Sequence, residues 1–347
     1  MARKASSKAA RKSRIGDLDS PHYEIYLQTI EKVGSEVSSY RPGAIRRPDV
    51  EALHAALKQR RLVIVLGAGM SVPLRLLNWT QLNEALFKSV LPPSFSRQIA
   101  PFVRELGTSA PILTRFVESE LSLRSELKSR LKENLYRDFD ERVSSRSMKA
   151  VLALLNPKLT RPAVSTVITY NFDDMLELAI KKEIPSLKFD SVVNAQSFAT
   201  SSRGLRIYHP HGFLPAHADS KFGYLDMPMV FSEPEFHDQY ARATSWENVV
   251  QSFVFGSQTC LFLGTSLSDP NLRRHLDFAR SALRGSNPEP RHFAVCGINT
   301  RSRSQKLATL INYFREKDML SLGVKPLWVS NFETGIPRLL KRIATGA

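Results

Sequence analysis

The stretch from Arg61 to Thr80 constrains the fold of this chain more than any other. It begins with the apolar run Leu62–Leu66, continues with a glycine turn at residues 67–71, and ends in a helical pattern. An apolar run without polar alternation is typical of a parallel strand covered on both faces. A glycine turn after such a strand lets the backbone approach a phosphate, and a following helix N-terminus offers N–H groups to it. The stretch therefore predicts an α/β fold with a phosphate-binding turn.

Apolar segments that predict further strands return after residue 160. They are Val164–Thr169, Arg206–His209, Met229–Ser232, Cys260–Gly264, His292–Ile298 and Val324–Val329. Helical patterns lie between several of them, and Asn78 with Gln81 forms a typical capping box for the helix after the first strand. Strands that alternate with helices predict a doubly wound, mainly parallel Rossmann-like sheet.

The chain is predicted to be organised around one large domain. Residues 1–19 are expected to be a flexible basic tail, and residues 20–347 the domain itself. Residues of about 96–156 carry amphipathic helical patterns and no strong strand, which predicts an all-helical insertion between the first and second strand regions.

Charge and cysteine content exclude several classes of protein. The net charge is +16, and residues 1–14 hold six Lys or Arg and no acid, so accessory contact with nucleic acid or an acidic partner is one reading of the tail. The apolar runs are far shorter than the roughly 20 residues that span a bilayer, and no secretory signal is seen, which predicts a cytoplasmic protein without a membrane segment. Two cysteines, Cys260 and Cys296, make neither a disulfide framework nor a zinc site.

The glycine turn departs from the fingerprint of dehydrogenases. A third glycine at the usual spacing is missing, and so is a clear acidic residue about twenty positions further on. The turn therefore favours an anionic dinucleotide ligand but not hydride transfer.

Three later segments place polar residues where predicted strands end. Thr169–Asp174 carries an Asn before two acids, of which Asp174 with Glu177 has capping-box spacing. At Tyr208–Gly212 two histidines lie two positions apart, and since no carboxylate stands at metal-like spacing, a general base is favoured over a metal ligand. Gly264–Asn271 offers a second phosphate- or ribose-binding loop, in which Asp269 caps a helix that starts with a proline.

Together, in this order, the four motifs resemble those of the sirtuin superfamily, and most of all the sirtuin-like proteins of bacterial anti-phage defence systems. The resemblance covers residues 61 to about 340. It implies a catalytic role for Asn171 and His211. It further implies an NAD-binding role for Gly67, Ala68, Gly69, Ser71, Asp173, Gly264, Thr265 and Ser266. The paired Cys-x-x-Cys zinc module of protein-deacetylating sirtuins is missing here, so no metal is expected and deacetylation is in doubt.

The resemblance thus implies an NAD hydrolase that cleaves NAD, its substrate, to ADP-ribose and nicotinamide. It also implies a gated effector, working as a homo-oligomer beside a triggering protein such as a HerA-like ATPase, an Argonaute-like protein or a STAND-type ATPase. Two alternatives stay open. One is a sirtuin-type deacylase or ADP-ribosyltransferase, and the other is a non-enzymatic subunit that senses NAD or ADP-ribose.

Overall fold

The computed structural model describes residues 21–95, 97–106, 110–121, 124–200, 204–217, 228–283, 289–300 and 304–347. The expected basic tail, residues 1–19, lies outside these ranges. The chain forms two compact units. Met1–Pro42 with Asn299–Arg315 makes the first, and Gly43–Ile298 with Glu316–Ala347 makes the second.

In the first unit, α2 (Pro21–Ser39) pairs with the N-terminal part of α14 (Gln305–Ser321). The Tyr313 hydroxyl donates a hydrogen bond to the Glu36 carboxylate over 2.8 Å. The Tyr313 ring meets the Tyr40 ring edge to face, with 5.5 Å between centroids. Aromatic pairs favour this arrangement because the positive edge of one ring faces the negative face of the other.

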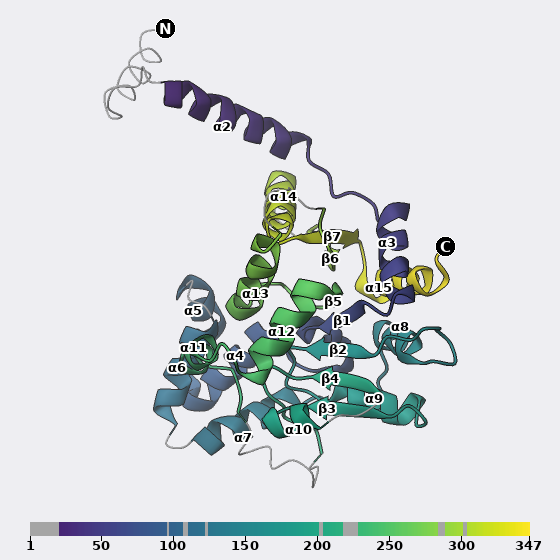
Figure 1. The fold of residues 1–347 in the computed structure, drawn as a ribbon. Helices are drawn as coiled ribbons and strands as arrows, with labels where there is room; N and C mark the ends of the chain where they lie inside the picture. Colours follow the sequence, from purple (N-terminus) through teal and green to yellow (C-terminus); the bar gives the residue numbers. More distant parts are fainter. Residues whose placement is uncertain are drawn as a thin grey trace. The chain divides into compact units, whose positions relative to one another are not determined.

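The second unit is built on a seven-stranded sheet in which every observed pairing is parallel (Figure 1). Its strand order is β3-β4-β2-β1-β5-β6-β7. The bounds are β1 Leu62–Leu66, β2 Thr166–Thr169, β3 Phe189–Val192, β4 Leu205–Tyr208, β5 Thr259–Leu263, β6 His292–Gly297 and β7 Val324–Val329. The chain winds outward from β1 in one direction and later in the other, which confirms the predicted doubly wound α/β fold. The switch point, where such sheets bind ligands, lies between β1 and β5.

Strand β1 shows why the apolar run has no polar alternation. All five residues are buried. Leu62, Ile64 and Leu66 belong to one hydrophobic cluster, whereas Val63 and Val65 belong to a second cluster on the opposite face of the sheet. Successive side chains of a strand point to opposite faces, so a central parallel strand needs apolar residues at every position.

Two sets of helices cover the two faces. Helices that contribute to the first cluster are α3 (Arg47–Lys58), α4 (Trp79–Val90), α8 (Arg146–Leu155), α9 (Met175–Glu183) and α15 (Phe332–Thr345). Helices that contribute to the second are α12 (Trp246–Ser257), α13 (Pro270–Ser281) and the C-terminal part of α14. The predicted capping box is confirmed at the start of α4, where Asn78 accepts from Gln81 N–H at 3.0 Å.

The described residues between about 96 and 156 are helical, as expected. They contain α5 (Ile99–Leu106), α6 (Ala110–Glu120), α7 (Arg124–Leu135) and α8. Leu113 and Val117 of α6 and Leu127 and Leu131 of α7 belong to the same hydrophobic cluster as β1. The helical region therefore shares the core of the sheet.

One predicted strand is absent, and one observed strand was not predicted. Met229–Ser232 is not a strand, since Ser232 is the N-cap of α11 (Glu233–Ala241) and the Phe231 ring stacks on the Trp79 ring at 4.7 Å. Conversely, β3 went unpredicted because it is an edge strand with polar Asp190 and Ser191. An apolar run thus marks burial, and only neighbouring backbone decides whether it becomes a strand.

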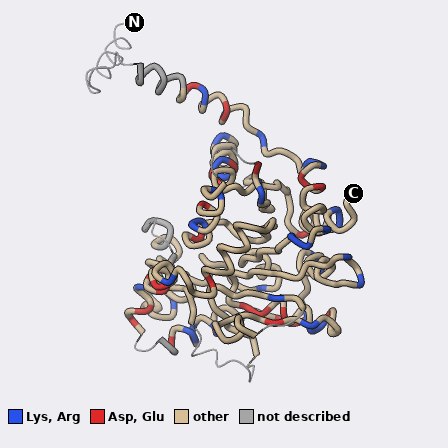
Figure 2. Tube along the Cα trace, viewed as in Figure 1, with Lys and Arg blue, Asp and Glu red and all other residues tan. Residues whose placement is uncertain are grey.

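The chain's basic residues are spread over many elements of the described structure (Figure 2). Within the described ranges, no helix combines the length and apolar character needed to cross a bilayer.

Candidate active site at the carboxyl edge of the sheet

The two glycine turns pack directly against each other at the switch point. Gly67 N–H donates to Leu263 O at 3.0 Å, and Gly69 N–H donates to Gly264 O at 2.8 Å. A Cβ on Gly67 would lie 2.7 Å from Gly264 O, and one on Gly69 would lie 2.8 Å from the same oxygen. The glycines are therefore required first of all so that one turn can lie on the other.

This packing uses most of the turn's N–H groups. Met70 N–H donates to Gly67 O and Ser71 N–H to Ala68 O, which leaves Ala68 N–H as the one turn donor without a bond to a described residue. The expected helix does not follow at once either. Two 3-10 turns, η1 (Ala68–Met70) and η2 (Val72–Leu74), precede α4, and left-handed Arg75 ends the second. A phosphate grip by several backbone amides and a helix N-terminus is thus not preformed here.

Asn171 is joined to the glycine turn by its side chain. Asn171 is buried, its Nδ2 donates to Ser71 Oγ at 3.1 Å, and its backbone N–H donates to Thr169 Oγ1 at 3.2 Å. Ser71 also interacts with Asp173, whose pKa it lowers. Three predicted site residues that lie up to 102 positions apart are thus brought together. Asn171 Oδ1 makes no bond to a described residue and stays available as an acceptor.

Asp173 is an unusual carboxyl group. Burial raises its pKa to about 6, and the interaction with Ser71 and the hydrogen bond from Met175 N–H only partly oppose that shift. Nearby Asp174 and Glu177 raise the pKa further. A carboxyl that titrates close to neutral pH inside a cluster of polar groups is typical of functional sites.

The raised pKa of Asp173 predicts how stability changes with pH. The folded-state pKa of about 6 exceeds the unfolded value of about 3.9, so the folded state binds more protons between these values. The free energy of unfolding should therefore fall by about 3 kcal/mol in all as pH rises from about 4 to about 6, of which roughly 1.4 kcal/mol is lost above pH 5. In Asp173→Asn this loss should be absent, which urea denaturation at about pH 5 and pH 8 would show. Equal pH slopes for both proteins would contradict the assignment.

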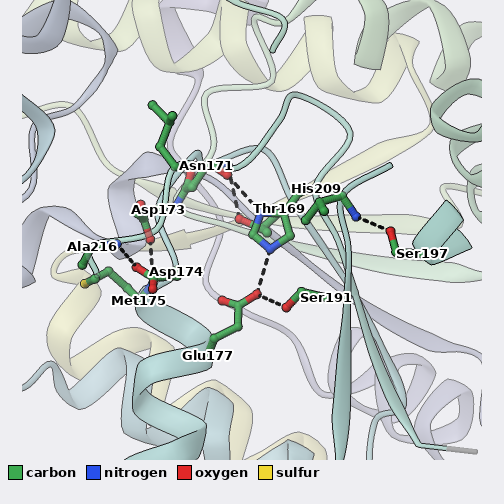
Figure 3. Close-up of polar contacts among 12 residues, drawn as sticks. Thr169, Asn171, Asp173, Asp174, Met175, Glu177, Ser191, Ser197, His209 and Ala216 are labelled. Atoms are coloured by element: carbon green, nitrogen blue, oxygen red, sulfur yellow. Dashed lines mark hydrogen bonds and ion pairs between the residues drawn. The ribbon is translucent and has the colours of Figure 1, made fainter. Parts of the chain in front are cut away.

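The predicted capping box at the start of α9 was wrong. Asp174 is the N-cap residue, but its side chain does not cap the helix. Its Oδ1 accepts from Ala216 N–H at 2.9 Å (Figure 3) and lies 3.1 Å from the Tyr136 hydroxyl oxygen. The same hydroxyl oxygen lies 2.7 Å from Leu214 O, and its one proton can go to either partner. One tyrosine beyond α7 thus contacts the loops that follow Asn171 and His211. The Asp174 carboxylate thus bonds residues far away in the sequence and does not form the cap of α9 that local spacing had predicted.

His211 lies in the loop that follows β4 and is almost fully buried. Neither ring nitrogen has a hydrogen-bond partner among the described residues. Nε2 lies 3.4 Å from Asp269 Oδ2, and the Tyr170 and Phe236 rings pack edge to face against the imidazole. Burial lowers the pKa of His211, and the Asp269 charge opposes that shift only in part. His211 is therefore a neutral base with unused nitrogens, held beside the Gly264 loop.

Gly212 is required by the backbone conformation of that loop. Its φ is +109°, a region that L residues rarely adopt, and a Cβ there would lie 2.8 Å from Pro228 O. The His-Gly pair thus owes its glycine to backbone geometry.

The loop after β5 is held mainly by its own residues. Thr265 Oγ1 accepts from Leu267 N–H at 3.2 Å, and the hydroxyls of Ser266 and Ser268 lie 2.6 Å apart. Asp269 caps α13 by accepting from Leu272 N–H at 2.6 Å, which confirms the predicted cap. Ser266 is exposed, so this loop presents hydroxyls to solvent at the switch point.

The two histidines of the His-Pro-His segment do not share a ligand. His211 lies beside Asp269, whereas His209 Nε2 contacts Glu177 Oε1 at 2.8 Å. The part of the chain that the structure describes contains no group of three or more His, Cys, Asp or Glu placed to hold a metal ion. Sequence reasoning missed Glu177 as a partner of His209, because 32 positions separate them.

Comparison with known proteins adds a family match. A solved structure described as a Sir2 homolog–NAD complex is 13% identical, with a TM-score of 0.41, and the alignment covers 88% of this chain and 97% of that one. No curated protein matches the chain. Residues 165–315, which contain Asn171, Asp173, His211 and the Gly264 loop, match the family model described as a SIR2-like domain.

Proposed function

We propose that this protein is an NAD glycohydrolase, which cleaves NAD to ADP-ribose and nicotinamide. The observation that carries the proposal is the grouping at one sheet edge of the hydrogen-bonded pair Asn171–Ser71 with Asp173 beside it, two interlocked glycine turns and a buried His211 with unused nitrogens. The match of residues 165–315 to the SIR2-like domain supports it. NAD would lie across the switch point, where open α/β sheets bind their ligands. Ala68 N–H and the Thr265–Ser266 loop would then contact its phosphates and adenosine side.

The reaction breaks the bond between the ribose anomeric carbon and the nicotinamide nitrogen, through an oxocarbenium-like state. Water forms the new bond to the anomeric carbon, nicotinamide leaves with the electron pair, and one proton is released. His211, neutral because burial lowers its pKa, accepts that proton. Asn171 Oδ1 accepts a hydrogen bond from the water or from a ribose hydroxyl, while its Nδ2 is fixed on Ser71. Asp173 would support the nicotinamide–ribose pocket.

Product analysis tests the proposal directly. The purified protein is incubated with NAD, with and without an acylated peptide, and the products are separated by chromatography. ADP-ribose and nicotinamide without peptide support the proposal. O-acyl-ADP-ribose formed only with peptide would identify a deacylase instead, and binding without turnover would identify a sensing subunit.

Asn171→Ala should lower the rate of NAD cleavage by about 100-fold, because the water or ribose loses its orienting acceptor. The isosteric variant Asn171→Asp keeps an acceptor but loses the donor to Ser71, so its rate should fall between wild type and alanine. Steady-state rates are compared at equal folded fraction, set by urea denaturation. A wild-type rate in Asn171→Ala would remove this residue from the site.

An enzyme that destroys an abundant cofactor must be gated, and we place this protein as such an effector in anti-phage defence. The trigger would be a partner protein or a change in the oligomer, with the helices between β1 and β2 as a contact surface. Size-exclusion chromatography coupled to the NAD assay tests this. Full activity of an isolated monomer at low concentration would contradict gating.

A further inference from the structure

His209, at the end of β4, is completely buried and both of its ring nitrogens face oxygen acceptors (Figure 3). Nε2 lies 2.8 Å from Glu177 Oε1, and Nδ1 lies 3.4 Å from the backbone oxygen of Asn171. Glu177 Oε1 also accepts from the Ser191 hydroxyl at 2.9 Å. Neither the proposed reaction nor the glycine turns use this cluster.

The two contacts require a proton on Nδ1. A carbonyl oxygen can only accept, so Nδ1 must carry hydrogen to bond Asn171 O. The second contact needs one further proton, either on Nε2 or on Glu177. Burial would raise the pKa of Glu177, but its interaction with His209 and the hydrogen bonds from His209 and Ser191 outweigh burial and lower it. The His209 ring thus joins the Glu177 carboxyl group to the Asn171 peptide through its two nitrogens.

The oxygen that His209 contacts lies where β2 leaves the sheet. Tyr170 N–H still donates to Leu66 O of β1 at 3.0 Å, whereas Asn171 N–H already turns to the Thr169 side chain. The backbone of Asn171 is thus held at its N–H by the Thr169 side chain and at its carbonyl oxygen by the His209 side chain, which follows β4. Because the side chain of Asn171 is fixed at its other end by Ser71, rotating this peptide would move the amide away from its place.

We propose that His209, held by Glu177, is a positioning residue that fixes the Asn171 peptide and thereby aims the Asn171 amide into the cleft. The proposal rests on the proposed function for its kinetic consequence, but not for its geometry. His209 would not touch NAD. Its loss should therefore lower kcat and leave KM nearly unchanged, since the reacting atoms are bound but poorly aligned.

The kinetic test uses His209→Gln and Glu177→Gln, which break the contact between the imidazole and the carboxyl group at little change in volume. Both should lower kcat for NAD cleavage by about 10–100-fold per folded molecule, and Glu177→Asp should restore part of it. His275→Gln is the matched control. His275 is buried too, and contacts Asn248 at 2.8 Å and Ser252 at 3.1 Å between α12 and α13, without a contact to His209 or Glu177 among its hydrogen bonds. It should keep the wild-type kcat, and wild-type kcat in His209→Gln would overturn the proposal.

A second readout needs no turnover. NMR of ¹⁵N-histidine-labelled protein, with His209 assigned from His209→Gln, should show a protonated Nδ1, as the contact with Asn171 O requires. The side-chain amide signals of Asn171, assigned from Asn171→Ala, should shift in Glu177→Gln and not in His275→Gln. An unprotonated Nδ1, or unshifted Asn171 signals, would overturn the proposal even if wild type cleaved NAD. If wild type does not cleave NAD, the proposed function fails and these spectra still decide the role of His209.

Discussion

His211→Ala should lower the rate of NAD cleavage by about 10²–10⁴-fold, the usual contribution of a positioned general base. Both nitrogens of the buried imidazole are free of hydrogen bonds to described residues, so the side chain has no structural bond to lose. The substitution removes packing against Tyr170 and Phe236, and the free energy of unfolding should therefore fall. The rate is therefore measured by single turnover at equal folded fraction. His275→Ala, which truncates a buried histidine outside the site, provides the control.

The direction of the His211 pKa shift predicts how the cleavage rate changes with pH. Neutral His211 is the base, and burial lowers its pKa, so cleavage should stay fast at neutral pH and fall only below the ordinary histidine range. Asp269 opposes the shift, because its charge favours the imidazolium. Asp269→Asn, which preserves a good cap for α13, should move the acid limb to still lower pH. An acid limb that persists unchanged in His211→Ala would assign the titration to another group.

Much of the fold follows from local pattern, because a central parallel strand must be apolar throughout. The central strand β1 lies where the apolar run predicts, at Leu62–Leu66, and its neighbour β5 at Thr259–Leu263 lies within one residue of the predicted bounds. The same reasoning fails at the β3 edge of the sheet. β3 needs no apolar run because one side of it has no neighbouring strand, and Met229–Phe231 is apolar because it packs in a loop.

The positions of the candidate site residues could be predicted, but not their partners. Carboxyl ends of parallel strands meet at one edge, so Asn171 and the Gly264 turn were expected near Gly67. That Asn171 bonds Ser71, and that Glu177 bonds His209 in place of capping its own helix, depends on contacts 100 and 32 positions apart. Local spacing carries no information about such pairs, and it misled at Asp174 and Glu177 because carboxylates serve equally well as caps.

The packing of the two glycine turns on each other could not be predicted from local sequence either. It has the largest expected effect on the free energy of unfolding. Gly264 has a φ of +69°, which costs an L residue roughly 1–2 kcal/mol. A Cβ there would also lie 2.5 Å from Met70 N and 2.9 Å from the Gly69 carbonyl carbon. Both atoms are backbone of the opposing turn, so neither can swing aside. Gly264→Ala should therefore lower the free energy of unfolding by about 2–5 kcal/mol, measured by urea denaturation.

Gly256, within α12, provides the control for this substitution. A Cβ at Gly256 would meet nothing within 4 Å, so Gly256→Ala should stabilise the protein by about 0.5–1 kcal/mol through helix propensity. The difference between the two alanine variants contains the φ penalty at Gly264 and the helix gain at Gly256, and what exceeds these two contributions measures how tightly the two turns pack. Gly264→Ala should also lose NAD cleavage, since separating the turns moves Ser71 and with it Asn171. Wild-type stability in Gly264→Ala would mean that the turns do not interlock. The glycines would then be explained by close approach of their backbone to a phosphate instead.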